Sequence, residues 1–283
     1  MQNQQKIQIQ AAIIALKKAT GKSQNAIATQ VGVSSANITQ ILKNNWESIS
    51  PELWQKVAVS LGVQTNGWQT AEIYNYRRVL AVCENAQSLS SAKIVSFDAG
   101  AGKTFALQGY AKNMQNVYYI QLERHYTKKV FLQKFGRVLG MQLTGSICEM
   151  IDEIIDKLKS AKKPLVIWDE FDKVLEKKGV FDLFKTFYDA TLDFCGFVLC
   201  GTTALEDQLK KCVKSNKIGY VELFSRCGCE YISLKALSVQ DVAMICRCNG
   251  ILDDKIIAEV RVELGQGDLR QLKNIIEKRK YFS

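Results

Sequence analysis

The sequence predicts an α/β protein in which a parallel sheet is covered by helices on both faces, with a small all-α domain before it and a helical lid after it. Between residues 70 and 237, helical patterns alternate with short apolar runs, which is typical of parallel strands joined by helices. The first 62 residues hold four short helical patterns punctuated by Gly and Ser, and only helical patterns follow Leu237. We therefore expect an all-α domain at 1–62, a linker at 63–69, an α/β core at 70–237 and a lid at 238–283.

The N-terminal segment matches a lambda-repressor-like helix-turn-helix at several spaced points. Ala28 is small where two helices cross closely, Gly32 allows the backbone to turn, and Ser34 can cap the second helix. The apolar face of that helix would consist of Val33, Ile38, Ile41 and Leu42. The candidates for contacts with DNA are Gln24, Ser34, Ser35, Asn37, Gln40 and Lys43. A small helical bundle used for protein contacts remains an alternative, because this face carries one positive charge.

The last helix of this domain has a clear start. Ser50 can cap it, Pro51 suits its first turn, and Glu52 lies favourably at the positive end of the helix dipole. The helical pattern ends near Gly62. The linker that follows contains the turn-forming pair Asn66-Gly67 and has no apolar periodicity.

Apolar runs and helical periodicity predict the elements of the core and the lid. The expected strands are residues 93–97, 117–122, 165–168, 197–201 and 231–234. The expected lid helices are residues 239–248, 254–264 and 268–279.

A glycine-rich segment at residues 98–104 follows the first strand and precedes a helical pattern at 105–112. In this context glycines let backbone N–H groups surround phosphates, Lys103 reaches the β and γ oxygens, and the Thr104 hydroxyl binds Mg²⁺. The segment therefore predicts a P-loop. Its candidate ATP-binding residues are Asp98, Ala99, Gly100, Ala101, Gly102, Lys103, Thr104 and Phe105. Phe97 replaces the usual first glycine, which leaves open whether ATP binding is weakened.

Two carboxylates, Asp169 and Glu170, follow the apolar strand 165–168. Buried carboxylates are costly unless they are paired, and after a P-loop their partners would be Mg²⁺ for Asp169 and the attacking water for Glu170. These are the roles of a Walker B motif. The sequence therefore predicts an ATPase whose cofactors are ATP and Mg²⁺.

Three further features occur in a fixed order that resembles AAA+ ATPases. The strand at 197–201 precedes Thr203, residues 223–226 end in Arg226, and residues 267–270 end in Arg270. The resemblance implies that Thr203 is the sensor-1 residue and touches the γ-phosphate or the water. It implies that Arg226 is an arginine finger acting on the neighbouring subunit, and that Arg270 is the sensor-2 residue contacting its own nucleotide.

The combination of a repressor-like N-domain, a short linker and a compact AAA+ module resembles the phage Mu B transposition protein family. Related helper ATPases of the IstB and TniB kind share the ATPase part. The resemblance implies an ATP-dependent homo-oligomer or filament on double-stranded DNA that delivers target DNA to a transposase. Candidates for backbone contacts in this core are Lys128, Lys129 and Lys134. Alternatives are a helicase loader or initiator-like ATPase, and a nucleotide-sensing helix-turn-helix transcription regulator.

Composition agrees with a polyanion partner. The 283 residues carry 38 Lys and Arg against 28 Asp and Glu, a formal charge of +10, which attracts nucleic acid in a salt-dependent way. The segment 1–62 contributes +4, from six Lys against two Glu, and the rest +6. Nine Cys without a disulfide framework and no apolar stretch of signal-peptide or bilayer length predict a cytoplasmic protein away from membranes. The pairs Cys227/Cys229 and Cys246/Cys248 lack the usual spacing of a zinc site, and the sole His125 is expected at the surface.

Overall fold

The computed structural model describes residues 3–63, 68–175 and 178–282. The chain forms two compact units. The sheet unit is Tyr74–Ala236, and the helical unit combines Met1–Ile73 with Leu237–Ser283. Among the helices in the described part of the chain, none has the length and apolar character that crossing a bilayer requires.

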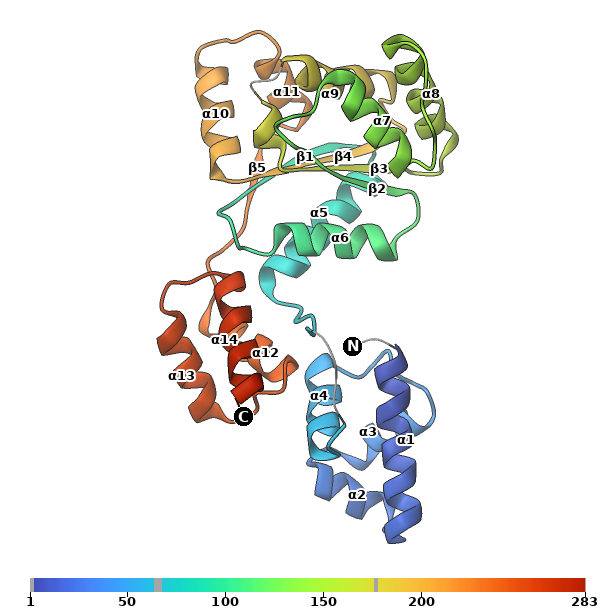
Figure 1. Cartoon of the computed structure of the whole chain (residues 1–283), viewed down its shortest axis with the longest axis vertical. Helices are drawn as coiled ribbons and strands as arrows, with labels where there is room; N and C mark the ends of the chain where they lie inside the picture. The colour runs from blue at the N-terminus through green and yellow to red at the C-terminus, as the bar shows by residue number, and fades with distance from the viewer. Residues whose placement is uncertain (1–2, 64–67, 176–177, 283) are drawn as a thin grey trace. The chain divides into compact units, whose positions relative to one another are not determined.

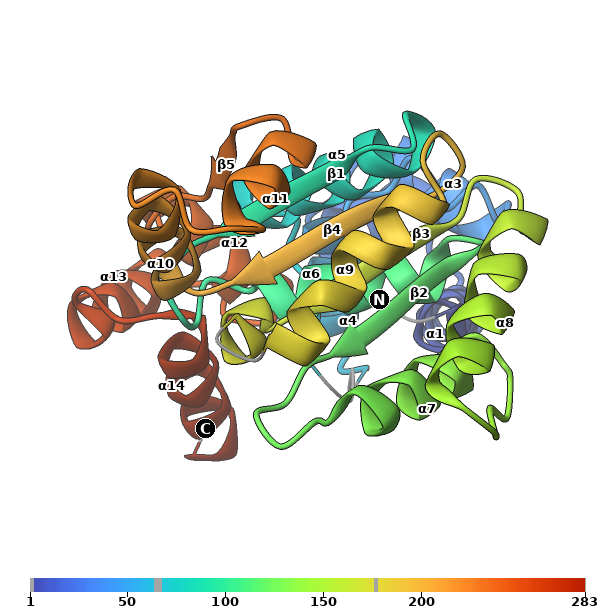
Figure 2. The ribbon, with the colours of Figure 1, turned by 90° about the horizontal axis from the view of Figure 1, so that it is seen from above.

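The sheet unit is built on five strands in the order β2-β3-β4-β1-β5, and every strand pair is parallel. Figure 2 shows β2, β3, β4 and β1 side by side. The predicted parallel sheet is thus confirmed, with ends that differ by one residue at most. The strands are β1 (Ala92–Ser96), β2 (Val117–Gln121), β3 (Leu165–Asp169), β4 (Gly196–Gly201) and β5 (Tyr231–Ser233).

Helices cover both faces of this sheet (Figure 1). The helices on one face are α5 (Tyr74–Ser88) and α6 (Lys103–Asn113). The helices on the other face are α7 (Lys128–Val138), α8 (Ile147–Ser160), α9 (Lys178–Ala190), α10 (Thr203–Lys214) and α11 (Tyr220–Arg226). A short 3-10 helix, η1 (Phe171–Val174), follows β3 directly.

The two cores of the sheet unit lie on opposite faces of the same strands. In β3, Val166 and Trp168 pack into the cluster under α7–α11, whereas Leu165 and Ile167 pack into the cluster under α5 and α6. All four are fully buried, as expected for a parallel strand covered on both sides. Gly196 starts β4 where a Cβ would lie 2.2 Å from the Ala86 carbonyl oxygen, so α5 and β4 can approach only because this residue has no side chain.

The N-terminal part of the helical unit contains the four predicted helices, α1 (Asn3–Thr20), α2 (Gln24–Val31), α3 (Ser35–Leu42) and α4 (Pro51–Ser60). The predicted turn is present: Gly32 has a φ of 74° and caps α2. Ser34 caps α3 through a capping box with Asn37, and Ser50 caps α4. Ile38 and Ile41 are fully buried in the small core.

The C-terminal part of this unit contains α12 (Val239–Cys248), α13 (Asp254–Leu264) and α14 (Leu269–Phe282). The first two match their predicted bounds. This part contacts the N-terminal part of the same unit at two places. The Cys248 thiol lies 3.5 Å from a Glu52 carboxylate oxygen, and Asn249 exchanges two hydrogen bonds with the backbone of Gln69. Residues 64–67 of the predicted linker lie outside the described residues.

Candidate nucleotide-binding site

The candidate site lies at the carboxyl edge of the sheet, because all five strands are parallel and end there. The P-loop follows β1, the Walker B carboxylates follow β3, and Thr202 follows β4. In open α/β sheets, ligands bind at this edge. These three segments are far apart in the sequence but lie at the same edge of the sheet.

The P-loop has the backbone that its glycines predict. Gly100 and Gly102 have φ values of 78° and 86°, a left-handed conformation that is costly for other residues. Helix α6 then begins at Lys103, so its free N–H groups face the loop. The Lys103 ammonium donates to the carbonyls of Phe97 at 2.6 Å and Asp98 at 2.8 Å. Burial lowers the pKa of Lys103, and nearby acidic groups, among them Asp169, oppose this shift.

The carboxylate at the end of β3 is held by three donors. Asp169 is 1% exposed, and its Oδ2 accepts from the Thr104 hydroxyl at 2.7 Å and from the Tyr119 hydroxyl at 2.9 Å. Its Oδ1 accepts from the backbone N–H of Glu170 at 2.9 Å. A hydroxyl and a carboxylate side by side form a hard oxygen donor set of the kind that Mg²⁺ prefers. Thr104 and Asp169 therefore fit the cation that the motifs imply.

Glu170 is held beside this pair in an unusual backbone conformation. Its φ is 57°, which is uncommon for a residue with a side chain and occurs often at functional sites. Gln121 at the end of β2 donates to its Oε1 at 2.9 Å, and Lys173 of η1 forms an ion pair with its other oxygen. A half-exposed carboxylate held in this way could orient a water molecule once these partners release it.

The end of β4 meets the P-loop through Thr203. The Thr203 hydroxyl donates to Asp98 Oδ1 at 3.3 Å, and its sensor-1 role stays a prediction. The preceding Thr202 donates to Asp172 through both its backbone N–H and its hydroxyl, at 3.3 Å each. At Gly201 a Cβ would lie 2.6 Å from Asp172 Oδ1, so this approach depends on glycine.

Arg226 forms an ion pair with an acidic residue of its own chain. At the end of α11, its Nε and Nη2 bind the two carboxylate oxygens of Asp189 at 2.8 and 3.0 Å. Glu222 lies 3.6 Å from Nη1, and the guanidinium lies 6.0 Å from the Tyr188 ring centroid. The side chain is 22% exposed. An arginine finger at this position must first leave a bidentate ion pair.

Arg270 belongs to the helical unit, in the first turn of α14. Its side chain is exposed, and its backbone N–H donates to Asp268 Oδ1 at 2.9 Å. Asp268 thus caps the helix that carries the sensor-2 candidate. Its role at the nucleotide stays a prediction.

The helix-turn-helix candidates divide into two groups. Gln24, Ser34 and Asn37 are used within the fold: Gln24 donates to the Ser35 carbonyl and the Thr39 hydroxyl, and the other two form the cap of α3. The hydrogen bonds of Gln24 join α2 to α3, and those of Ser34 and Asn37 close the first turn of α3. Among the remaining candidates, Ser35 and Lys43 are exposed, and Gln40 is half-buried.

The core candidates for DNA contacts lie on α7. Lys129 and Lys134 are exposed, whereas Lys128 is half-buried with its stem against Gly179. Lys128 and Lys129 occupy the first turn of α7, which contains no acidic residue. Positive charge at a helix N-terminus is unfavourable with respect to the helix dipole, so Lys128 and Lys129 do not stabilise α7 through its dipole.

Four residues that lie at the site were not predicted from the sequence: Tyr119, Gln121, Asp172 and Lys173. Tyr119 and Gln121 are two residues apart on β2, so their side chains point to the same face of the sheet. Because β2 pairs with β3, both lie beside Asp169 and Glu170. Polar side chains at the carboxyl end of a strand next to the Walker B strand were the signal that could have found them. For Asp172 and Lys173, closeness to Glu170 in sequence was the available signal.

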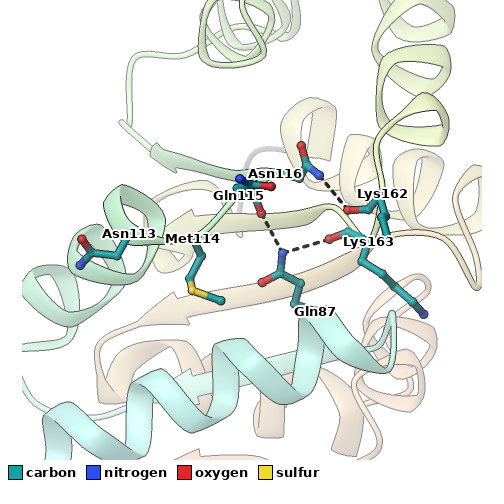
Figure 3. Close-up of a pocket in the computed structure, with 7 residues that line it drawn as sticks. All are labelled: Gln87, Asn113, Met114, Gln115, Asn116, Lys162 and Lys163. Carbon is teal, nitrogen blue, oxygen red and sulfur yellow. Dashed lines mark hydrogen bonds between the residues drawn. The ribbon is translucent and has the colours of Figure 1, made fainter. Parts of the chain in front are cut away.

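Two other features lie outside this site. A surface hollow of about 430 Å³ opens at the amino edge of the sheet, where Gln87 donates to the carbonyls of Gln115 and Lys163 (Figure 3). All nine Cys are free thiols, and no group of three metal-binding side chains occurs within the described ranges, so the Cys-x-Cys pairs show no zinc site there. His125 is 67% exposed, as expected.

Comparison with known proteins finds a family model that matches part of the sheet unit. Residues 94–209, from β1 to the middle of α10, match the family model described as AAA domain. This segment contains the P-loop, Asp169, Glu170 and Thr203. The central part of the chain is therefore similar to AAA domains.

Solved structures of other proteins are similar to this chain. The Aeropyrum pernix Orc1 protein in complex with DNA has a TM-score of 0.52 and 16% identity, over 74% of this chain and 58% of that chain. DnaA bound to AMPPCP and single-stranded DNA has a TM-score of 0.49 and 18% identity, over 74% and 61%. Domain III of Thermotoga maritima DnaA has a TM-score of 0.47 and 19% identity, over 72% and 80%. The chain spans less than two thirds of the Orc1 chain, and that likeness shows the fold alone. No curated protein matches the chain.

Proposed function

We propose that this protein is an ATP-dependent DNA-binding ATPase that acts in DNA transposition and hydrolyses ATP between the subunits of a DNA-bound oligomer. The observation that carries the ATPase part is the 2.7 Å contact between the Thr104 hydroxyl and Asp169, with Glu170 next in the chain. This contact joins the end of the P-loop to the end of β3. Both halves of a phosphoryl-transfer site therefore lie at one edge of the sheet.

The residues divide the chemistry among them. The N–H groups at the start of α6 and the Lys103 ammonium bind phosphate oxygens, while Thr104 and Asp169 hold Mg²⁺. When bound, Mg²⁺ neutralises charge that develops on the phosphate oxygens. Glu170 orients the attacking water, and Thr203 contacts that water or the γ-phosphate. Arg226 of one subunit stabilises the transition state at the next, and Arg270 contacts the nucleotide of its own chain.

The experiment that tests the ATPase part compares Lys103→Ala with Glu170→Gln in the full-length protein. Lys103→Ala should abolish nucleotide binding because the phosphates lose their cation. Glu170→Gln should keep binding and lose hydrolysis, because the neutral amide does not orient the attacking water as the carboxylate does. Fluorescent-nucleotide titration and phosphate release measure the two effects. Unchanged ATP affinity in the Lys103 variant would remove the P-loop assignment.

The DNA part of the proposal is supported by charge and by fold. The chain carries a formal +10, α7 exposes Lys129 and Lys134, and the Orc1 protein that shares the fold was solved in complex with DNA. Contacts made mainly to phosphates predict binding that falls steeply with salt and varies little among unrelated duplexes. Replacing both lysines with Ala should reduce the salt dependence by about two phosphate contacts, measured as the slope of log affinity against log salt. An unchanged slope would place the DNA surface elsewhere.

The likeness to Orc1 favours an initiator-like or helicase-loading ATPase as the second candidate. The two candidates differ in the partner that stimulates hydrolysis. Turnover on DNA should rise with a transposase encoded beside this gene if the first proposal holds, and with a replicative helicase if the second holds. A preference for one duplex on the order of 10³ without any effect of ATP would instead indicate a transcription regulator.

A further inference from the structure

Tyr119 is a polar side chain at the nucleotide site that belongs to none of the sequence motifs. It lies in β2, opposite Ile167 of β3, and its hydroxyl donates to Asp169 Oδ2 at 2.9 Å. Gln108 of α6 donates to the same hydroxyl at 3.4 Å. A chain of hydrogen bonds therefore runs from α6 through Tyr119 to the carboxylate implied in binding Mg²⁺.

Packing alone does not explain why residue 119 carries a hydroxyl group. Its ring lies half-buried against the cluster under α5 and α6, where Phe would fill the same space. Burying a hydroxyl costs free energy unless it gains a partner, and here the partner is the nearly inaccessible Asp169. The pairing points to a role for the hydroxyl in holding the carboxylate.

The two donors to Asp169 Oδ2 come from different elements. Thr104 belongs to α6 and Tyr119 to β2, so the carboxylate is held by both elements. Groups that hydrogen-bond to metal ligands fix the orientation of those ligands, and their removal typically lowers metal affinity or activity by about 10- to 100-fold.

We propose that Tyr119 is a positioning residue that sets the Mg²⁺ affinity of the nucleotide site by holding Asp169. The inference rests on the proposed function and deepens it, since it concerns the cation of the same site. Tyr119 touches neither nucleotide nor cation in this role. Gln108 strengthens the effect because a hydrogen bond donated to a hydroxyl oxygen polarises its O–H bond.

The test uses full-length Tyr119→Phe and a fluorescent ATP analogue titrated at a series of Mg²⁺ concentrations and in EDTA. The affinity in EDTA should match that of the wild type, because the P-loop is intact. The Mg²⁺ concentration for half-maximal enhancement should rise about tenfold. Gln108→Leu should raise the same Mg²⁺ concentration by a smaller factor. If Tyr119→Phe lowers the melting temperature, Gln108→Leu is the variant on which the inference is judged.

The matched control is Tyr118→Phe, which changes the neighbouring residue of β2. Tyr118 packs into the cluster on the opposite face of the sheet, so its variant should keep the wild-type Mg²⁺ dependence. An unchanged Mg²⁺ dependence in Tyr119→Phe overturns the inference and leaves the proposed function intact. A wild-type protein whose nucleotide binding ignores Mg²⁺ overturns the proposed function itself.

Discussion

The ion pair between Arg226 and Asp189 predicts that the proposed arginine finger is restrained until subunits assemble. Asp189→Asn removes the charge that holds it while keeping the size of the side chain. Asp189 is 46% exposed, so its ion pair with Arg226 is weakened by solvent. Because the contact is bidentate, we place its stabilising free energy at about 1 kcal/mol, the upper end for exposed pairs. Since 1.4 kcal/mol corresponds to about tenfold, freeing Arg226 should raise turnover up to about fivefold at protein concentrations below full assembly.

The assay is steady-state ATP hydrolysis measured against protein concentration. Asp193→Asn is the matched control, because it removes a nearby exposed charge that forms no ion pair with Arg226. Arg226→Ala should suppress turnover and leave nucleotide affinity near normal, and mixing it with Glu170→Gln should restore some activity at mixed interfaces. The reasoning is refuted if Asp189→Asn is as inactive as Arg226→Ala, because Asp189 would then hold the arginine in its working position.

Three further predictions follow from single contacts. Gly201→Ala would bring a Cβ to 2.6 Å from Asp172 Oδ1, so turnover should fall while nucleotide binding persists. Gly179→Ala, whose Cβ would lie nearest to the flexible Lys128 stem, should be neutral in the same two assays. Gln121→Ala releases Glu170 from its hydrogen bond and should change turnover without changing ATP affinity, and a change in affinity alone would contradict this. Ser34→Ala removes the cap of α3 and should cost about 1 kcal/mol of unfolding free energy, measured by denaturant titration against Ser35→Ala.

Local patterns in the sequence predicted the elements and the main motifs because these depend on neighbours in the chain. The alternation of strands and helices, the turn at Gly32 and the caps at Ser34 and Ser50 are all present. So is the parallel sheet, which brings Thr104 and Asp169 together. Each of these follows from the periodicity or backbone preference of residues close in sequence.

Contacts between distant segments could not be predicted in the same way. Gln24 matched a helix-turn-helix position, but its amide is used to join α2 to α3. Arg226 carried the right motif, yet its pairing with Asp189, 37 residues earlier, depends on how α9 and α11 pack. The strand order β2-β3-β4-β1-β5 places Tyr119 beside Asp169, and no local pattern encodes that order.

The charges gathered at the carboxyl edge of the sheet bear on how the proposed nucleotide and its cation would bind together. Asp98, Asp169 and Asp172 all lie close enough to Lys103 to act on its charge, and Glu170 pairs with Lys173. Among the described residues, these four carboxylates outnumber the two ammonium groups by two. A triphosphate alone would be repelled by that excess, whereas a divalent cation offsets it and is bound by oxygens of both partners. Nucleotide and Mg²⁺ should therefore bind with positive coupling, each raising the affinity for the other by the same factor. Removing one carboxylate by Asp172→Asn should weaken that coupling and raise the affinity for ATP in EDTA. A fall in that affinity would show that Asp172 acts through its hold on Thr202 and not through its charge.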